Sequence, residues 1–129
     1  MDDLTHAPRA QLADVTGFRM MRDFSWTAAE KKIARAAFDR AVSRELASVR
    51  HEVESMLAGS PDVHGVWRVH DYLSDKRREI DTKYDYRYSV LLSVFARLVQ
   101  EGWLSESDLC GLAADKVGAI TRILALGRP

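Results

Sequence analysis

The 129-residue chain has nineteen basic and nineteen acidic residues, a formal net charge of zero, and 47% hydrophobic residues. This length suits one domain with a buried core, and the balanced charge gives no global attraction to nucleic acid or an anionic membrane. The single cysteine excludes an internal disulfide, and no apolar run approaches the ~20 residues of a membrane span. The acidic N-terminus lacks the apolar region of a signal peptide, so we expect a soluble, cytoplasmic protein.

Residues 1–24 show weak periodicity and contain a proline and a glycine, so we expect a poorly ordered leader. Residues 25–129 are expected to form a single helical domain. The first helix is predicted from near Ser25 to Gly59, because no glycine or proline interrupts that stretch. Thr27 and Glu30 have the spacing of a capping box. An apolar stripe follows at steps of three and four: Phe38, Val42, Leu46, Val49, Val53 and Met56.

A second helix is predicted to start after Pro61 or after Gly65, and no glycine or proline follows before Gly102. Its pattern allows either one continuous helix to Glu101 or a bend within residues 82–86. The run 75–83 has seven charged residues among nine, so this part of the helix needs charge partners if it is buried. The apolar stripe has helical spacing throughout: Val66, Val69, Leu73, Ile80, Tyr84, Tyr88, Leu91, Phe95 and Leu98. We also expect Glu79 and Lys83 to form an i, i+4 ion pair.

Residues 25–101 are therefore expected to form a stalk of long helices, and residues 102–129 a small helical head. Ser105 and Asp108 have the spacing of a helix cap, and Gly111 and Gly118 are expected to divide the head into two short helices.

The length of the first helix predicts a partner. About 32 residues span ~48 Å at 1.5 Å per residue, whereas a compact domain of this size has a radius of gyration of only ~14 Å. The apolar stripe of such a helix extends beyond any globule that the remaining chain can form. A second copy in a twofold dimer is the simplest cover, so we expect an elongated helical dimer.

No residue pattern indicates an enzyme, a metal site or a cofactor. His70-Asp71 is typical of metal-dependent phosphohydrolases, but the further ligands that this chemistry requires are missing. Residues 104–124 have the rhythm of a helix-turn-helix motif, yet they offer a DNA groove only Lys116, Thr121 and Arg122. DNA binding therefore remains a minor alternative.

A patch around Trp67 combines a large aromatic side chain with paired charges, the composition of interaction hot spots. From these residues alone, a binding surface and an ordinary exposed helix face fit equally well.

One block of sequence carries a family resemblance: Trp67-x-x-His70-Asp71-Tyr72-Leu73-Ser74-x-Lys76-Arg77-x-Glu79-Ile80-Asp81-x-Lys83-Tyr84-Asp85-x-Arg87-x-Ser89. This block closely resembles the fluorescence recovery protein family of cyanobacteria, and the similarity covers roughly residues 25–126. The resemblance implies an all-α, antiparallel homodimer with a stalk and a head and without a cofactor. It also implies a regulator that binds the photoactivated orange carotenoid protein at its C-terminal domain. Binding would speed that protein's return to the inactive orange form and so end photoprotective quenching.

Carried over by position, the resemblance assigns the dimer or partner interface to Trp67, His70, Asp71 and Arg77, with Asp71 and Arg77 expected to pair. It adds two groups of supporting residues. Those of the central motif are Tyr72, Leu73, Lys76, Glu79, Asp81, Lys83, Tyr84 and Arg87. Those of the head are Ser93, Phe95, Asp115, Lys116 and Ala119.

Two head positions depart from the family pattern. Where family members carry a phenylalanine and a lysine implicated in carotenoid-protein binding, this chain has Ser93 and Ala119. The fold is unaffected by these departures, but two partners remain open. One is the orange carotenoid protein, and the other is a different protein bound by the same helical dimer.

Overall fold

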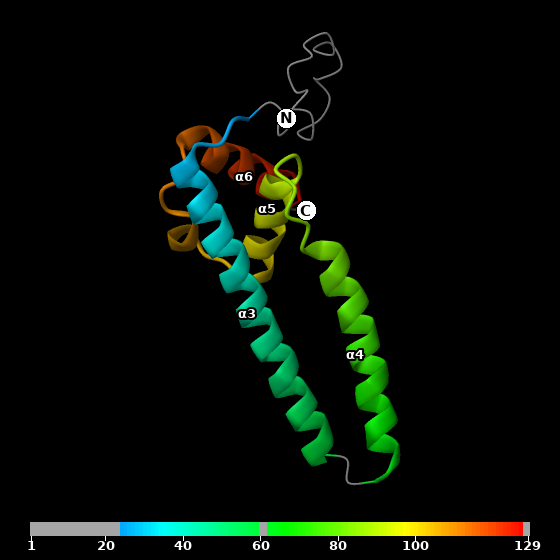
Figure 1. The fold of residues 1–129 in the computed structure, drawn as a ribbon. Coiled ribbons are helices and arrows are strands. Elements are labelled where there is room, and N and C mark those ends of the chain that lie inside the picture. The colour runs from blue at the N-terminus through cyan, green and yellow to red at the C-terminus, as the bar shows by residue number, and fades with distance from the viewer. Residues whose placement is uncertain (1–23, 60–61, 128–129) are drawn as a thin grey trace.

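The computed structural model describes residues 24–59 and 62–127, and all the regular elements in these ranges are helical (Figure 1). The predicted all-α fold is thereby confirmed. The expected leader, apart from Phe24, lies outside the described residues. The elements are α3 (Ala28–Gly59), α4 (His64–Lys83), α5 (Leu91–Glu101), the 3₁₀ helix η3 (Glu106–Leu109) and α6 (Ala114–Leu126).

The predicted capping box starts α3. The backbone amide of Thr27 donates to Glu30 Oε1 at 3.0 Å, and the amide of Glu30 donates to Thr27 Oγ1 at 3.1 Å. These two bonds satisfy amides that the first turn leaves without helical partners. The helix begins at Ala28, three residues later than the sequence pattern suggested.

Helices α3 and α4 run antiparallel as a long hairpin (Figure 1). At its turn, the amide of Gly65 donates to Asp62 Oδ1 at 3.0 Å. The residues of α4 that are buried or half-buried at steps of three and four face α3 and form a seam: Gly65, Val69, Tyr72, Lys76, Ile80 and Lys83. The stripe predicted from the sequence is thus split, because Val66 and Leu73 lie outside this seam and are exposed.

Helix α4 ends at Lys83, so of the two alternatives the bend near residues 82–86 is the one that forms. Residues 84–87 belong to no helix or strand and residues 88–90 form a turn, and the alternate residues Tyr84, Tyr86 and Tyr88 pack on the N-terminal half of α3. The ring of Phe38 lies 5.4 Å from that of Tyr84 and 4.8 Å from that of Tyr86, both edge to face. These three tyrosines therefore recur along the sequence with a period of two rather than of 3.6.

Helix α5 lies in the head beside α6 and the N-terminal half of α3, which moves the expected end of the stalk from residue 101 back to residue 83 (Figure 1). Leu91, Leu92, Phe95 and Leu98 are completely buried. They pack with alanines that let the helices approach closely: Ala34, Ala37 and Ala41 on α3 and Ala119 on α6. The core therefore sits at one end of the molecule, and the rest of the hairpin extends away from it.

The two glycines expected to divide the head play different parts. Gly111 lies in the turn between η3 and α6 with φ of +107°, and an added Cβ would sit 2.4 Å from Ile33 Cδ1. Gly118 lies inside α6, where an added Cβ would meet only Arg122 Nη1 at 3.6 Å. The division between two short helices therefore falls at Gly111 alone.

These environments predict opposite effects of the same substitution. Gly111→Ala should lower the free energy of unfolding by about 1–3 kcal/mol, because it combines a left-handed backbone with a clash. Gly118→Ala should raise it by about 0.5–1 kcal/mol, since alanine favours a helix interior. Urea unfolding of the two variants measures both effects, and changes of the same sign would contradict this account.

Candidate functional site

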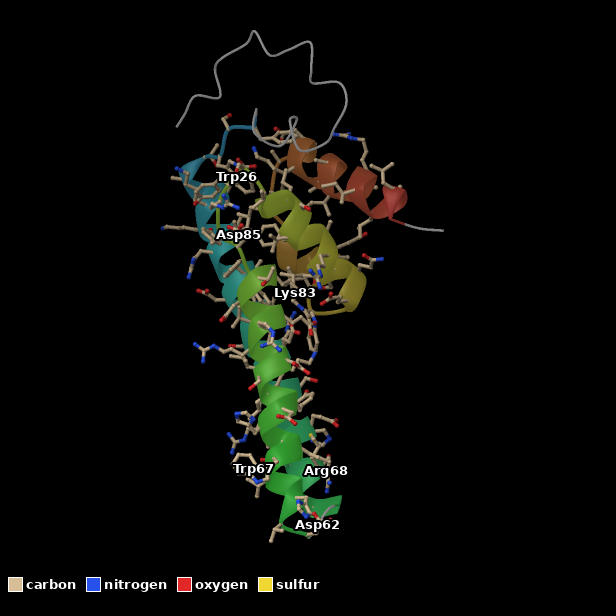
Figure 2. All side chains as sticks on the ribbon, turned by 90° about the vertical axis from the view of Figure 1, so that its right-hand side faces the viewer. Trp26, Asp62, Trp67, Arg68, Lys83 and Asp85 are labelled. Atoms are coloured by element: carbon tan, nitrogen blue, oxygen red, sulfur yellow. The ribbon has the colours of Figure 1, made fainter. Side chains whose placement is uncertain are left out.

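The residues predicted to form the interface lie along α4, well away from the core of the head (Figure 2). The Trp67 side chain is 65% exposed, and its ring packs edge to face on that of His70, with centroids 5.9 Å apart. His70 Nδ1 lies 3.2 Å from Asp71 Oδ1. The contact between Trp67 and His70 thus lies on a surface open to solvent.

Trp67 and His70 share one side of α4 with exposed apolar side chains. We call Val66, Trp67, His70, Leu73 and Arg77 the stalk face. At 100° per residue their average direction is about a third of a turn from the seam that packs on α3. On α3, Leu46 and Leu57 are also about half exposed. Large apolar side chains gathered on exposed helices are typical of a surface that a partner covers.

Asp71 and Arg77 do not pair with each other within one chain. Arg77 Nε donates to Asp81 Oδ2 at 3.3 Å, while Asp71 contacts His70. The two residues are six positions apart on one helix and so point in different directions. An ion pair between them requires two chains.

The supporting motif residues fall into surface pairs and inward contacts. At the surface, Lys76 Nζ lies 3.6 Å from Glu79 Oε1, and Arg87 Nη2 donates to Asp85 Oδ2 at 2.6 Å. The predicted pair of Glu79 with Lys83 does not form, because Lys83 turns inward toward other carboxylates. Tyr72 is half-buried in the seam, and Leu73 is exposed.

The ammonium group of Lys83 is at the centre of a buried charge cluster where α4 meets the head (Figure 2). It lies 2.7 Å from Glu45 Oε1 on α3 and 2.6 Å from Glu101 Oε1 at the end of α5. The hydroxyl of Tyr84 donates to the same oxygen of Glu45 at 2.9 Å. Burial and the nearby Glu45 carboxylate raise the pKa of Tyr84 above its usual range, so this hydroxyl stays a donor.

Glu101 receives two further donors. Trp103 Nε1 donates to its Oε1 at 3.2 Å, and Arg97 Nε donates to its Oε2 at 2.8 Å. Burial alone would raise the pKa of Glu101, but the hydrogen bonds from Lys83 and Arg97 lower it below the usual value. Two carboxylates thus face two cations at this junction.

A second buried pair joins the start of α3 to α6. Lys116 Nζ donates to Glu30 Oε1 at 3.1 Å and also to the carbonyl oxygen of Ser25. The amide of Ala113 donates to Glu30 Oε2 at 2.8 Å. Burial alone would raise the pKa of Glu30, but the amides of Thr27 and Ala113 and the ammonium of Lys116 hold it at about 2.

The predicted head residues do not form one surface. Phe95, Lys116 and Ala119 are buried, because they lie on the inner faces of α5 and α6. Only Ser93 and Asp115 present their side chains to solvent. A contact between the head and a partner through these positions is therefore restricted to those two residues.

Glu45 and Glu101 are the residues whose importance the sequence reasoning missed. Both occur in the stretches that carry the family resemblance, but no role followed from their spacing. The available signal was the position of Lys83, which continues the seam of α4 and so places a charge on an inward face. Its partners lie on other elements, so the pattern of one helix does not identify them.

Within residues 24–59 and 62–127, no three side chains of His, Cys, Asp or Glu are arranged to hold a metal ion. None of the described helices is both long and apolar enough to cross a membrane.

Comparison with known proteins gives consistent matches over the helical part of the chain. Residues 26–125 match the family described as photoprotection regulator fluorescence recovery protein. The fluorescence recovery protein of Synechocystis sp. is 41% identical over 101 residues, which cover 78% of this chain and 93% of that protein.

Two solved structures have a similar fold. The Fremyella diplosiphon fluorescence recovery protein is 42% identical, with a TM-score of 0.71, over 79% of this chain and 99% of that one. The Synechocystis protein is 40% identical, with a TM-score of 0.73, over 78% of this chain and 99% of that one.

The buried carboxylates predict acid sensitivity. The pKa of Glu30 is depressed from 4.5 to about 2, and hydrogen bonds from Arg44 and from the Ser105 amide lower that of Asp108. A carboxyl whose folded-state pKa is depressed contributes stability above its unfolded pKa and loses that contribution as the pH falls through its folded pKa. The melting temperature should therefore fall between about pH 4.5 and pH 2.

Glu30→Gln separates this effect from general acid denaturation. It should lower stability at pH 7 by about 3 kcal/mol, because it leaves Lys116 buried without its carboxylate. It should also make the acid limb, the fall of the melting temperature as the pH decreases, shallower. Asp39→Asn, which alters an exposed carboxylate paired with Arg35, serves as the control and should change neither. Calorimetry across this pH range tests the prediction, and an unchanged acid limb in Glu30→Gln would contradict it.

Proposed function

This chain belongs to the fluorescence recovery protein family of photoprotection regulators, and on that basis we propose that it binds the photoactivated orange carotenoid protein. Binding at the C-terminal domain of that protein accelerates its return to the inactive orange form. The observation that carries the proposal is the match of the family over residues 26–125, which includes the whole block from Trp67 to Ser89.

We propose that the working form is an antiparallel homodimer assembled through the stalk. Trp67, Val66 and Leu73 are exposed in the single chain, although large apolar side chains gain free energy from burial. Helix α3 also extends well beyond the head (Figure 1). A second copy covers both the exposed side chains of α4 and the part of α3 beyond the head. With a twofold axis, the same patch forms the interface on each chain.

In this dimer, Asp71 of one chain pairs with Arg77 of its partner. Each makes only an exposed contact within its own chain, so each is free to exchange it. An ion pair at the edge of an apolar interface fixes which alignment of the two stalks is stable.

The proposed regulator acts without making or breaking bonds. To speed the return of the carotenoid protein, it must bind a state along the return path more tightly than it binds the red form. Equal affinity for both would leave the barrier unchanged. A rigid dimer suits this task, because two heads held at a fixed separation select one arrangement of the partner.

Assembly is testable directly. Light scattering should give about twice the chain mass, and Asp71→Leu and Arg77→Leu should each weaken association by about 1–3 kcal/mol, because each leaves its partner's charge without its pair. Arg122→Leu, the same substitution as Arg77→Leu but on the exposed side of α6, is the control and should leave association unchanged. A wild-type protein that is monomeric at high micromolar concentration would rule out the dimer.

The regulatory activity is measured with a photoconverted orange carotenoid protein in the dark. Added chain should accelerate the red-to-orange relaxation followed by visible absorbance. The effect should be weaker than for a typical family member, since the exposed Ser93 lacks the aromatic area expected at that position. Trp67→Ala should reduce it further by removing an interface tryptophan worth about 2 kcal/mol, and Trp67→Phe should retain most of it.

Carotenoid proteins from several sources are needed, because one mismatched partner would give a false negative. If the chain accelerates the relaxation of none of these proteins, the proposed function is wrong. That result would favour a different protein partner for the same dimer. If wild type and Trp67→Ala accelerate the relaxation equally, the proposed function stands, but the stalk face takes no part in it.

A further inference from the structure

Helix α4 is anchored to the rest of the chain at its two ends. Of its twenty residues, only Gly65 and Lys83 are buried. Gly65 belongs to the turn, where its amide bonds to Asp62 and the chain itself holds α4 near α3. The seam residues between the two ends are only half-buried. At the opposite end of α4, Lys83 is the other buried residue of the helix, and it contacts α3 and α5.

The Lys83 side chain is completely buried, and its ammonium bridges two elements. Glu45 on α3 and Glu101 on α5 each place a carboxylate oxygen within 2.7 Å and 2.6 Å of it, respectively. We call these three residues the Lys83 clamp. Without the ammonium, the two carboxylates would face each other and repel, and α4 would lose the ion pairs that link Lys83 to α3 and α5.

The clamp sits at one end of the helix that carries the stalk face. Lys83 is six residues beyond Arg77 and sixteen beyond Trp67 on the same uninterrupted helix, so a rotation or shift at Lys83 moves the whole face (Figure 2). Lys76 shares the seam, but its side chain is 29% exposed and its ion pair, with Glu79, stays within α4. It cannot hold α4 against another helix.

We propose that Lys83 is a positioning residue, whose buried ammonium bonds to Glu45 and Glu101, holds α4 against α3 and so orients the stalk face. The role of the stalk face as an interface rests on the proposed function, but the anchoring of α4 does not. The clamp links the head to the stalk, because Glu101 belongs to the head and Lys83 ends the helix that carries Trp67.

Hydrogen exchange measured by mass spectrometry on the full chain tests the anchoring. Lys83→Met keeps the alkyl chain and removes the ammonium. Amides of residues 66–82 should then exchange at least about tenfold faster, while α5 and α6 keep their protection. Lys76→Met is the matched control on the same seam and should leave exchange in α4 close to that of the wild type.

A double variant separates anchoring from simple charge balance. Lys83→Met with Glu45→Gln removes the unpaired carboxylate on α3 but does not restore the link to α4. It should recover part of the melting temperature and still show fast exchange in residues 66–82. Wild-type exchange in α4 of either Lys83 variant would overturn the proposal. So would equal loss of protection in α4, α5 and α6, which would make Lys83 an ordinary core residue.

Sedimentation equilibrium then connects the clamp to assembly. Lys83→Met should raise the dimer dissociation constant at least about tenfold, while Lys76→Met should not. A wild-type chain that is already monomeric would refute the proposed dimer. The exchange rates of α4 would still test the clamp in that case, so the two failures are distinguishable.

Discussion

The interaction on which this structure depends is the burial of one ammonium group between two carboxylates. Removing Lys83 and Glu45 from water is costly, whereas the side chain of Glu101 stays 31% exposed. The attraction among the three offsets that cost only when the geometry is close and the remaining hydrogen-bonding groups are satisfied. Both conditions hold here. The distances are 2.6 and 2.7 Å, and Tyr84, Trp103 and Arg97 supply further donors. A buried ion cluster is by itself weak evidence for net stability, because well-packed apolar residues of similar volume often stabilise a fold as much.

A similar arrangement of a buried ammonium and a carboxylate lies at the start of α3. The Glu30 carboxylate accepts hydrogen bonds from the amides of Thr27 and Ala113 and from the ammonium of Lys116. Thr27 belongs to the cap of α3, and the other two donors belong to the head. Between the two buried pairs, the aromatic rings of Trp26, Tyr88, Tyr86, Phe38 and Tyr84 follow one another in contact along α3. Helix α3 is thus fixed to the head along its N-terminal half and leaves its C-terminal half free for the stalk.

This division separates two tasks within one small domain. The head buries the large apolar side chains of α5 against alanines of α3 and closes its own core. The stalk leaves Trp67 and its apolar neighbours exposed, and this exposure adds no stability to a single chain. A regulator that acts by selecting one state of its partner needs such an arrangement, because a rigid body with an unsatisfied surface binds without reorganising itself.

The sequence by itself determined the helical class, the capping box of Thr27 and Glu30, the break between the two long helices and the family. All of these follow from local spacing or from a long ungapped match. Only the tertiary structure decided that α4 ends at Lys83, that α5 belongs to the head and that Phe95 and Ala119 are buried. The reason is distance along the chain: Tyr84 and its acceptor Glu45 are 39 positions apart, and Lys116 and Glu30 are 86. A charge on an inward face indicates that it has a partner, but the packing of other helices determines which residue that partner is.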